Sequence, residues 1–227
     1  MTTRSRSIRS VAPVRRRPEL TWEEFSRHWR EEHAAIARRM PGLAAYTQAH
    51  IDPEEQPAGR PHSWRHDGVP LATFADLAAI EMLRESPEYQ EEAVPDEAAF
   101  TDRASMSPVL LVESFGGPPE SRTSDGRTLF VFASTVGVDE GSGRRLVAAL
   151  SAIPGAEVAL AHRWSVALDA DSGLGGREVP ARSWDGMLEV WFPDVASARD
   201  VAGRIASDQR ALPFPVSCTV GRENRVF

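Results

Sequence analysis

The chain has 227 residues, 41% of them hydrophobic, and carries a net charge of −7. This length suits two small modules, and the negative charge argues against general nucleic-acid binding. All 26 residues of the lysine and arginine class are arginine, so a Schiff-base lysine, a pyridoxal-phosphate anchor and a lysine-bearing phosphate loop are excluded.

The single cysteine, Cys218, rules out an intrachain disulfide and a cysteine-rich zinc or iron–sulfur site. It stands in an alternating stretch, which predicts a buried strand residue. No apolar run is long enough to cross a membrane, and the arginine-rich start is followed by a charged helix rather than the apolar core of a signal peptide. We therefore expect a cytoplasmic protein.

The first element with clear boundary signals is a helix from Thr21 to Met40. Thr21 with Glu24 forms a capping box, and Leu20 supplies the matching hydrophobic staple. A Pro-Gly pair after Met40 stops the helix. Four apolar residues recur at helical spacing and predict a buried stripe: Phe25, Trp29, Ile36 and Met40.

Two histidines lie at opposite margins of this predicted stripe. In a regular α-helix, at about 100° per residue, His28 and His33 point apart by roughly 140°. They are therefore poor joint ligands for one metal ion, and no metal site is expected. His62 and His66 are spaced to chelate a metal only on a helix, which Pro61 argues against.

After Gly42 the sequence alternates with a period of two, which predicts a strand over residues 43–51. One face is small and apolar, suited to lie under the helix. The other face offers Tyr46, Gln48 and His50, a phenol, an amide and an imidazole in a row. We predict that this polar row lies opposite the helix, where it lines a pocket. The later acidic run from Glu81 to Glu97 is interpreted as a solvated helix face.

Residues 20–50 resemble the EthD-like proteins of the dimeric α/β-barrel superfamily, whose pattern runs L-[ST]-x-E-E-F-x-x-H-W-x-x-x-H, then P-G-L-x-x-Y and a strand ending in histidine. Three later strings fit the same family in order and spacing: Asp67-Gly68, Ser86-Pro87-Glu88-Tyr89, and the stretch from Asp96 to Asp102. The resemblance covers about residues 7–115. It places Asp96 and Asp102 in a loop near the pocket mouth.

An internal repeat predicts a second module of the same kind. The stretch DGVPLATFADLAA from Asp67 aligns without a gap with DGMLEVWFPDVAS from Asp185, and a Pro-Gly pair recurs at Pro154. We expect a first module at residues 7–116 and a second, degenerate module at 127–227. The elements expected in the second module are strands over 127–135 and 215–221 and helices over 143–153 and 195–207.

The predicted fold class is α+β, with two ferredoxin-like β-α-β-β-α-β modules. Each would have a four-stranded antiparallel sheet with helices on one face. The resemblance implies that the two sheets pack as a pseudo-dimeric α/β barrel within one chain, and a further homodimer stays open.

The second half lacks the polar row. A gap-free match from Pro154 gives three counterparts to it: Ala159, Ala161 and Arg163. A one-residue shift would instead bring His162 to the position of His50. The first half is therefore expected to carry any chemistry.

Within the first half, His50 is the leading candidate for a general acid–base residue, with His33 and Tyr46 as further catalytic candidates. An imidazole titrates near neutral pH and takes a proton from an activated carbon or phenol, while Tyr46 could orient a carbonyl. The plainer interpretations are a boundary histidine and a rim tyrosine. The candidates for substrate binding are Gln48, Trp29, His28, Phe100 and Asp102, with Trp29 mainly in a packing role.

The resemblance implies cofactor-free chemistry on an aromatic or polyketide-like carbonyl compound, such as cyclisation, dehydration, decarboxylation or lactone isomerisation. The expected activity is that of a lyase or isomerase, and the expected partner is a small hydrophobic molecule, neither nucleic acid nor a membrane. Three alternatives stay open: a non-catalytic protein that sequesters a hydrophobic metabolite, a cofactor-free monooxygenase, and a haem protein.

Overall fold

The computed structural model describes residues 7–59, 65–106, 108–135, 137–168 and 184–227. His62 lies outside the described residues, so the expectation that His62 and His66 do not chelate a metal stays a prediction. The chain divides into two compact units, one drawn from residues 1–50, 66–112 and 223–227 and the other from residues 51–65 and 113–222. In the described ranges, no helix combines the length and apolar character needed to span a bilayer.

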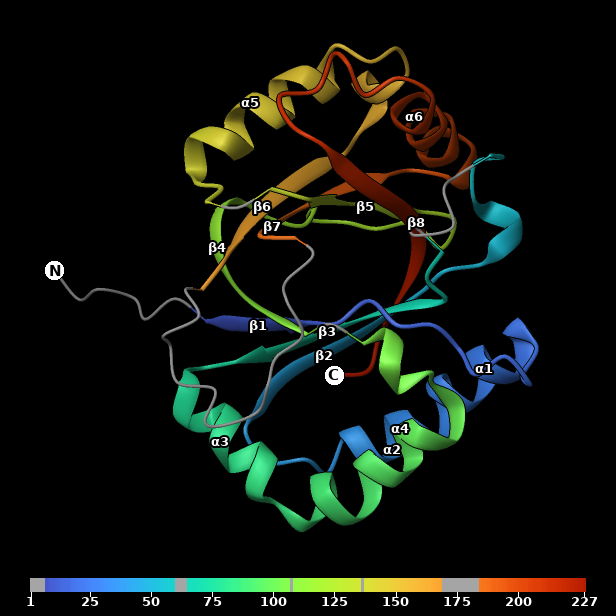
Figure 1. The fold of residues 1–227 in the computed structure, drawn as a ribbon, viewed down its shortest axis with the longest axis vertical. Helices are drawn as coiled ribbons and strands as arrows, with labels where there is room; N and C mark the ends of the chain where they lie inside the picture. The colour runs from blue at the N-terminus through green and yellow to red at the C-terminus, as the bar shows by residue number, and fades with distance from the viewer. Residues whose placement is uncertain (1–6, 60–64, 107, 136, 169–183) are drawn as a thin grey trace, which may run out of the picture. The chain divides into compact units, whose positions relative to one another are not determined.

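The first unit is an antiparallel sheet with strand order β2-β3-β1-β4 and its helices on one face (Figure 1). Its elements, in chain order, are β1 (Ile8–Val11), α1 (Trp22–His28), the π-helical turn η1 (Trp29–His33), α2 (Ala34–Ala37), β2 (Leu43–His50), β3 (Gly68–Phe74), α3 (Leu77–Glu85), the π-helical turn η4 (Glu88–Ala93), α4 (Val94–Phe100), the 3₁₀ helix η5 (Arg103–Ser105) and β4 (Val109–Gly116).

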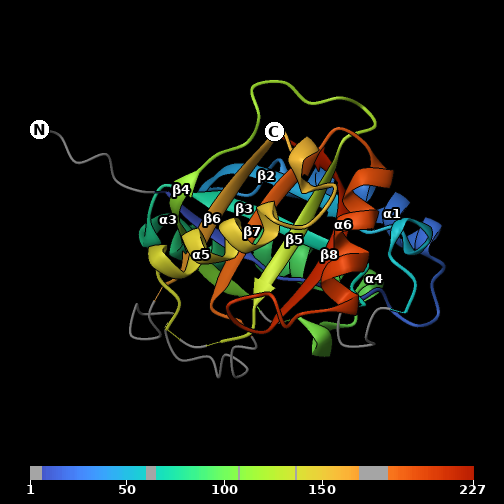
Figure 2. The ribbon, with the colours of Figure 1, turned by 90° about the horizontal axis from the view of Figure 1, so that it is seen from above.

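The second unit repeats the same order of elements. Its strands pair as β8-β5-β7-β6, and Figure 2 shows α5 and α6 lying over this sheet. The elements are η2 (Pro53–Glu55), β5 (Arg127–Ala133), α5 (Glu140–Ser151), η6 (Ala156–Val158), β6 (Ala161–Ala167), β7 (Gly186–Phe192), α6 (Val195–Ser207) and β8 (Val216–Arg225). The predicted strands and helices of this half are confirmed, and Cys218 is buried in β8 as expected.

The first helix begins where its capping box predicts. The Thr21 hydroxyl accepts from the Glu24 backbone, and the Glu24 carboxylate accepts from the Thr21 backbone at 2.8 Å. The interior of the helix differs from the prediction, because Trp29–His33 form a π-helical turn between α1 and α2. In such a turn residues five apart are joined, and the Ala34 N–H donates to the Trp29 carbonyl. The directions of side chains that a regular α-helix predicts therefore do not apply beyond Trp29.

The polar row of β2 lies on the helix side of the sheet, so the prediction that it faces away from the helix is wrong. Tyr46, Gln48 and His50 are all buried, and each makes a hydrogen bond to a residue of the α1–η1 segment. The prediction assumed that only small apolar side chains lie under a helix. Polar side chains are buried there instead because each finds a hydrogen-bond partner, which offsets the loss of water.

The hydrogen-bonded registers also correct the predicted equivalence of the two halves. His50 pairs with Gly68 in the first sheet, and Val166 pairs with the aligned Gly186 in the second. The counterparts of Tyr46, Gln48 and His50 are therefore His162, Trp164 and Val166. The gap-free match was wrong by three residues because the chain after Pro154 includes the additional short helix η6.

Gly68 provides the space for the Trp29 ring. A Cβ atom at Gly68 would lie 2.4 Å from the Trp29 Cζ3 atom, and the Trp29 side chain is buried. We expect Gly68→Ala to lower the free energy of unfolding by about 1–3 kcal/mol, because the ring must move within a packed region. Urea denaturation measures this change.

Gly117→Ala is the matched control for this prediction, because nothing lies within 4 Å of a Cβ atom there. It is expected to leave the stability nearly unchanged or slightly raised. Equal denaturation midpoints for the two variants would contradict the close packing of Trp29 on Gly68.

Candidate functional site

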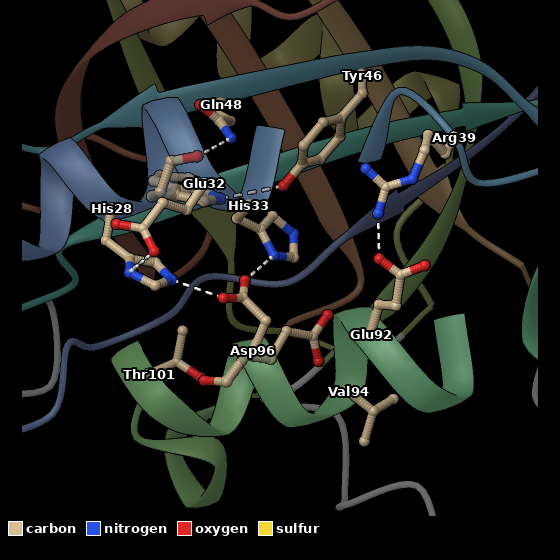
Figure 3. Close-up of polar contacts among 12 residues, drawn as sticks. His28, Glu32, His33, Arg39, Tyr46, Gln48, Glu92, Val94, Asp96 and Thr101 are labelled. Carbon is tan, nitrogen blue, oxygen red and sulfur yellow. Dashed lines mark hydrogen bonds and ion pairs between the residues drawn. The ribbon is translucent and has the colours of Figure 1, made fainter. Parts of the chain in front are cut away.

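Two histidines of the first helical segment converge on one carboxylate of α4 (Figure 3). His33 Nδ1 lies 2.8 Å from Asp96 Oδ2, and His28 Nε2 lies 2.7 Å from Asp96 Oδ1. The prediction that the two rings point apart is wrong because of the π-helical turn: His28 and His33 are five residues apart, the spacing that such a turn aligns. The side chains of three residues therefore form one hydrogen-bonded group.

Asp96 was predicted to lie in a loop and in a solvated acidic run, and both predictions are wrong for this residue. It belongs to α4, and its side chain is only 14% exposed, whereas Glu91 and Glu92 nearby are exposed. Burial acts to raise the pKa of Asp96, but the hydrogen bonds from His33 and His28 outweigh it, and the pKa lies below its ordinary value. Asp96 is therefore an ionised group held by two imidazoles.

His33 is buried among aromatic rings. Its ring lies 5.4 Å from that of Phe100 and 6.2 Å from that of Tyr46, the latter edge-on. Within the described ranges, the structure gives His33 Nδ1 its bond to Asp96 and gives Nε2 no hydrogen-bond partner. A carboxylate on Nδ1 fixes the tautomer and leaves Nε2 able to accept a proton.

The Tyr46 hydroxyl lies beside this imidazole (Figure 3). It accepts a hydrogen bond of 3.1 Å from the Trp29 indole Nε1–H and also has the Gln48 side chain within hydrogen-bonding reach, so its own proton can go to Gln48 or to the oxygen of a bound molecule. Burial raises the pKa of Tyr46 well above its ordinary value. The phenol therefore stays protonated over the working pH range and can act as a donor.

His50, the leading catalytic candidate from the sequence, is held at both nitrogens. The Ser26 hydroxyl lies 2.9 Å from His50 Nδ1, and Gln48 Oε1 lies 3.4 Å from Nε2. The ring also lies 4.7 Å from Trp29. This arrangement suits a fixed, neutral imidazole more than a base with an open nitrogen.

Gln48 links the strand to the helix. Its Nε2 donates to the Trp29 carbonyl at 2.6 Å, and its Oε1 accepts from Asn224 Nδ2 at 3.1 Å. Ser26 and Asn224 were not predicted as members of the site. Neither belongs to the polar row, and only the tertiary structure shows their contacts.

The two remaining substrate-binding candidates, Phe100 and Asp102, have structural contacts in the fold. Phe100 is buried with Val14, Phe25 and Trp29, where it forms part of the core beneath the histidines. Asp102 accepts from the Ala104 N–H at 3.2 Å and caps η5. Among the described residues, no group of three or more histidine, cysteine, aspartate or glutamate residues is arranged to hold a metal ion.

Comparison with known protein families places this cluster in a recognised domain. Residues 17–104 match the model of the EthD domain. The chain carries an EthD domain. The EthD span includes His28, His33, Tyr46, His50 and Asp96. No curated protein matches the chain.

Solved structures resemble the chain over nearly its whole length. An anthrone oxidase-like protein is 12% identical with a TM-score of 0.59, covering 98% of this chain and 94% of its own. A protein of Fusobacterium nucleatum provisionally named a monooxygenase is 8% identical with a TM-score of 0.56 and the same coverage. Chlorite dismutase of Candidatus Nitrospira defluvii is 10% identical with a TM-score of 0.51, covering 97% and 92%. At these identities the likeness shows the fold alone, the predicted α+β, dimeric α/β-barrel class with two modules.

Proposed function

We propose that this EthD-domain protein is a lyase or isomerase that moves protons next to the carbonyl group of an aromatic or polyketide-like compound, without a cofactor. The observation that carries the proposal is the pairing of His33 with Tyr46. His33 is held by Asp96 at Nδ1 and has no partner on Nε2 among the described residues, and the Tyr46 hydroxyl has its acceptor position filled by Trp29.

Enolisation needs a base that removes the proton from carbon and a donor that stabilises the carbonyl oxygen, and these two groups can supply both. His33 Nε2 would take a proton from the carbon next to the carbonyl, and Asp96 would stabilise the imidazolium that forms. Tyr46 would donate a hydrogen bond to the carbonyl oxygen as negative charge develops there. Return of the proton to another carbon gives isomerisation, and its transfer to a departing hydroxyl gives dehydration. The reaction returns both groups to their starting states.

His33 is the better candidate for the base than His50. An incoming proton needs a nitrogen lone pair that is not already engaged, and both nitrogens of His50 lie close to hydrogen-bonding side chains. We therefore assign His50, with Ser26 and Gln48, to holding β2 against the helix.

A second candidate is a cofactor-free monooxygenase. The full-length fold likeness to an anthrone oxidase-like protein and to a provisionally named monooxygenase favours it. Removal of a proton from a hydroxyaromatic or anthrone-type compound by His33 would also begin this reaction. The carbanion would then add molecular oxygen and take the proton back to give a hydroperoxide, which loses water to leave a new carbonyl group. The two candidates therefore share a base and differ in their need for oxygen.

A turnover assay tests the proposal. The purified protein is incubated with anthrone and with a panel of hydroxyaryl ketones and β-keto acids, with and without oxygen, and products are followed by mass spectrometry. We expect turnover without oxygen, and a fall in kcat of about 100-fold or more in His33→Ala. His50→Ala should act mainly through stability, and Arg30→Gln, which changes an exposed arginine paired with Glu31, should retain activity.

Three outcomes would overturn the proposal. Turnover only in the presence of oxygen would favour the monooxygenase. Saturable binding without turnover would favour a metabolite-binding protein. Full activity in a folded His33→Ala variant would remove His33 as the base.

A further inference from the structure

We propose that His28 is a positioning residue for the His33 base and acts through the shared Asp96 carboxylate, which it orients and whose charge it partly compensates. This inference rests on the proposed function of His33. His28 was expected from the sequence to contact substrate, and nothing in the EthD match assigns it a role.

The carboxylate of Asp96 is fixed from two sides. One oxygen takes His28 Nε2 at 2.7 Å and the other takes His33 Nδ1 at 2.8 Å. With both oxygens engaged, the plane of the carboxylate cannot rotate without breaking one of the two hydrogen bonds. The orientation of the His33 ring therefore depends on His28 as well as on Asp96.

The contacts also define where the charges lie. The second nitrogen of His28, Nδ1, lies 3.3 Å from Glu32 Oε2 (Figure 3). Ionised carboxylates only accept hydrogen bonds, so an imidazole that carries a proton on each nitrogen suits this position. The proposal assigns the positive charge of the group to His28. Among the described residues, His33 faces a carboxylate at Nδ1 alone, where one N–H suffices for the hydrogen bond.

This distribution suits a base. If Asp96 faced His33 alone, its full negative charge would favour the protonated imidazole, which cannot accept a further proton. The positive charge of His28 offsets part of that field. Within the described ranges, the charged and titratable groups that contact this pair include Glu32 from η1, Asp96 from α4 and Tyr46 from β2. In the proposal, His28 thereby favours the form of His33 that can accept a proton.

The π-helical turn makes the arrangement possible. A regular α-helix would turn His28 and His33 apart by roughly 140°, too far for both to contact one carboxylate from the same side. Turns of this kind are found frequently at functional sites. The turn η1 therefore gives the pair its geometry, and Asp96 on α4 completes it.

The test uses the full-length protein and two variants of His28. His28→Gln keeps a donor for Asp96 but removes the charge, and His28→Leu removes both. Histidine-selective ¹⁵N NMR reads the proton occupancy of each ring without any substrate, and ¹³C NMR follows the titration of the Asp96 carboxyl group. Arg30→Gln, which changes an exposed arginine of η1 paired with Glu31, is the matched control.

We expect His28 to be doubly protonated and His33 to be singly protonated at Nδ1 near neutral pH. In His28→Leu the Asp96 carboxyl should titrate at higher pH than in the wild type, because one of its two donors is lost. With an active substrate, kcat should fall about tenfold while KM changes little, and His28→Gln should recover part of kcat. In both variants the acidic limb of the pH–activity profile should move to higher pH.

The proposal is overturned if His28 is neutral when both neighbouring carboxylates are ionised, or if His28→Leu leaves the Asp96 titration unchanged. It is also overturned if the variants lower stability but leave the pH–activity profile in place, which is the result for a purely structural ion pair. Absence of turnover in the wild type would contradict the proposed function, whereas the NMR measurements decide the charge arrangement independently.

Discussion

Replacement of Trp29 with alanine is expected to lower the free energy of unfolding of the first unit by about 3–5 kcal/mol. The side chain is 2% exposed, and its ring lies 5.6 Å from Phe25 and 4.7 Å from His50. Truncation would open a cavity over Gly68, where no Cβ atom is present to fill it. It would also leave the Tyr46 hydroxyl without its donor. Urea denaturation followed by circular dichroism measures the loss.

Trp29→Phe separates packing from the polar contact. Phenylalanine keeps an aromatic ring in the space but cannot donate to Tyr46, so the variant should lose about 1–2 kcal/mol. If activity is found, this variant should be more impaired in kcat than its stability suggests, because the unsupported phenol is free to turn. Equal and small losses in both variants would contradict a central role for Trp29 in the packing.

Local signals in the sequence account for the elements that were predicted correctly. The capping box at Thr21 depends on residues three apart, and its bonds form as the pattern indicates. The second module was predicted from the repeat of the Asp67-Gly68 stretch at Asp185, which the registers of both sheets bear out. Such features need only neighbouring residues, or two segments that keep the same length.

The orientation of the polar row could not be predicted in the same way. Alternation along β2 separates two faces but does not say which one lies under the helix when both are buried. Tyr46, Gln48 and His50 lie there because Trp29 and Ser26 supply partners, and these come from a different element. The choice is therefore made by tertiary contacts.

The π-helical turn was the feature that most changed the candidate site. Its residues, Trp29–His33, have no composition that distinguishes them from a regular helix. The extra residue in the turn is supported from outside, by Gln48 on the Trp29 carbonyl and by Asp96 on both histidines. Asp96 itself stands among acidic residues that are mostly exposed, and no local pattern separates it from them.

The second module shows that an insertion, like a tertiary contact, could not be predicted from the local pattern. Three residues of η6 shift the strand that follows Pro154, and Trp164 then stands where the first unit has Gln48. The Trp164 ring packs on Gly186, the counterpart of Gly68, which Trp29 covers from the helix in the first unit. Trp164 and Val166 thus take the places of Gln48 and His50, consistent with a candidate site in the first unit.

Replacement of Asp96 with asparagine is expected to lower the free energy of unfolding by about 1–3 kcal/mol at neutral pH, because two charge-assisted hydrogen bonds are weakened. The amide that replaces the carboxylate can accept at only one of its two terminal atoms, so at least one histidine contact must change. Asp102→Asn is the matched control, since asparagine is as good an N-cap as aspartate. Its stability at neutral pH should stay close to that of the wild type.

The same substitution should alter the response of stability to acid. Burial acts to raise the pKa of Asp96, but hydrogen bonds from His33 and His28 outweigh it and hold the folded pKa below the ordinary value. The stabilisation is therefore complete above the unfolded pKa, about 4, and is lost as the pH falls through the folded pKa. An asparagine has no proton to gain in this window. Urea denaturation at a series of pH values below about 5 should give a shallower decline for Asp96→Asn than for the wild type. Parallel declines would show that the two imidazoles do not hold this carboxylate in its ionised form.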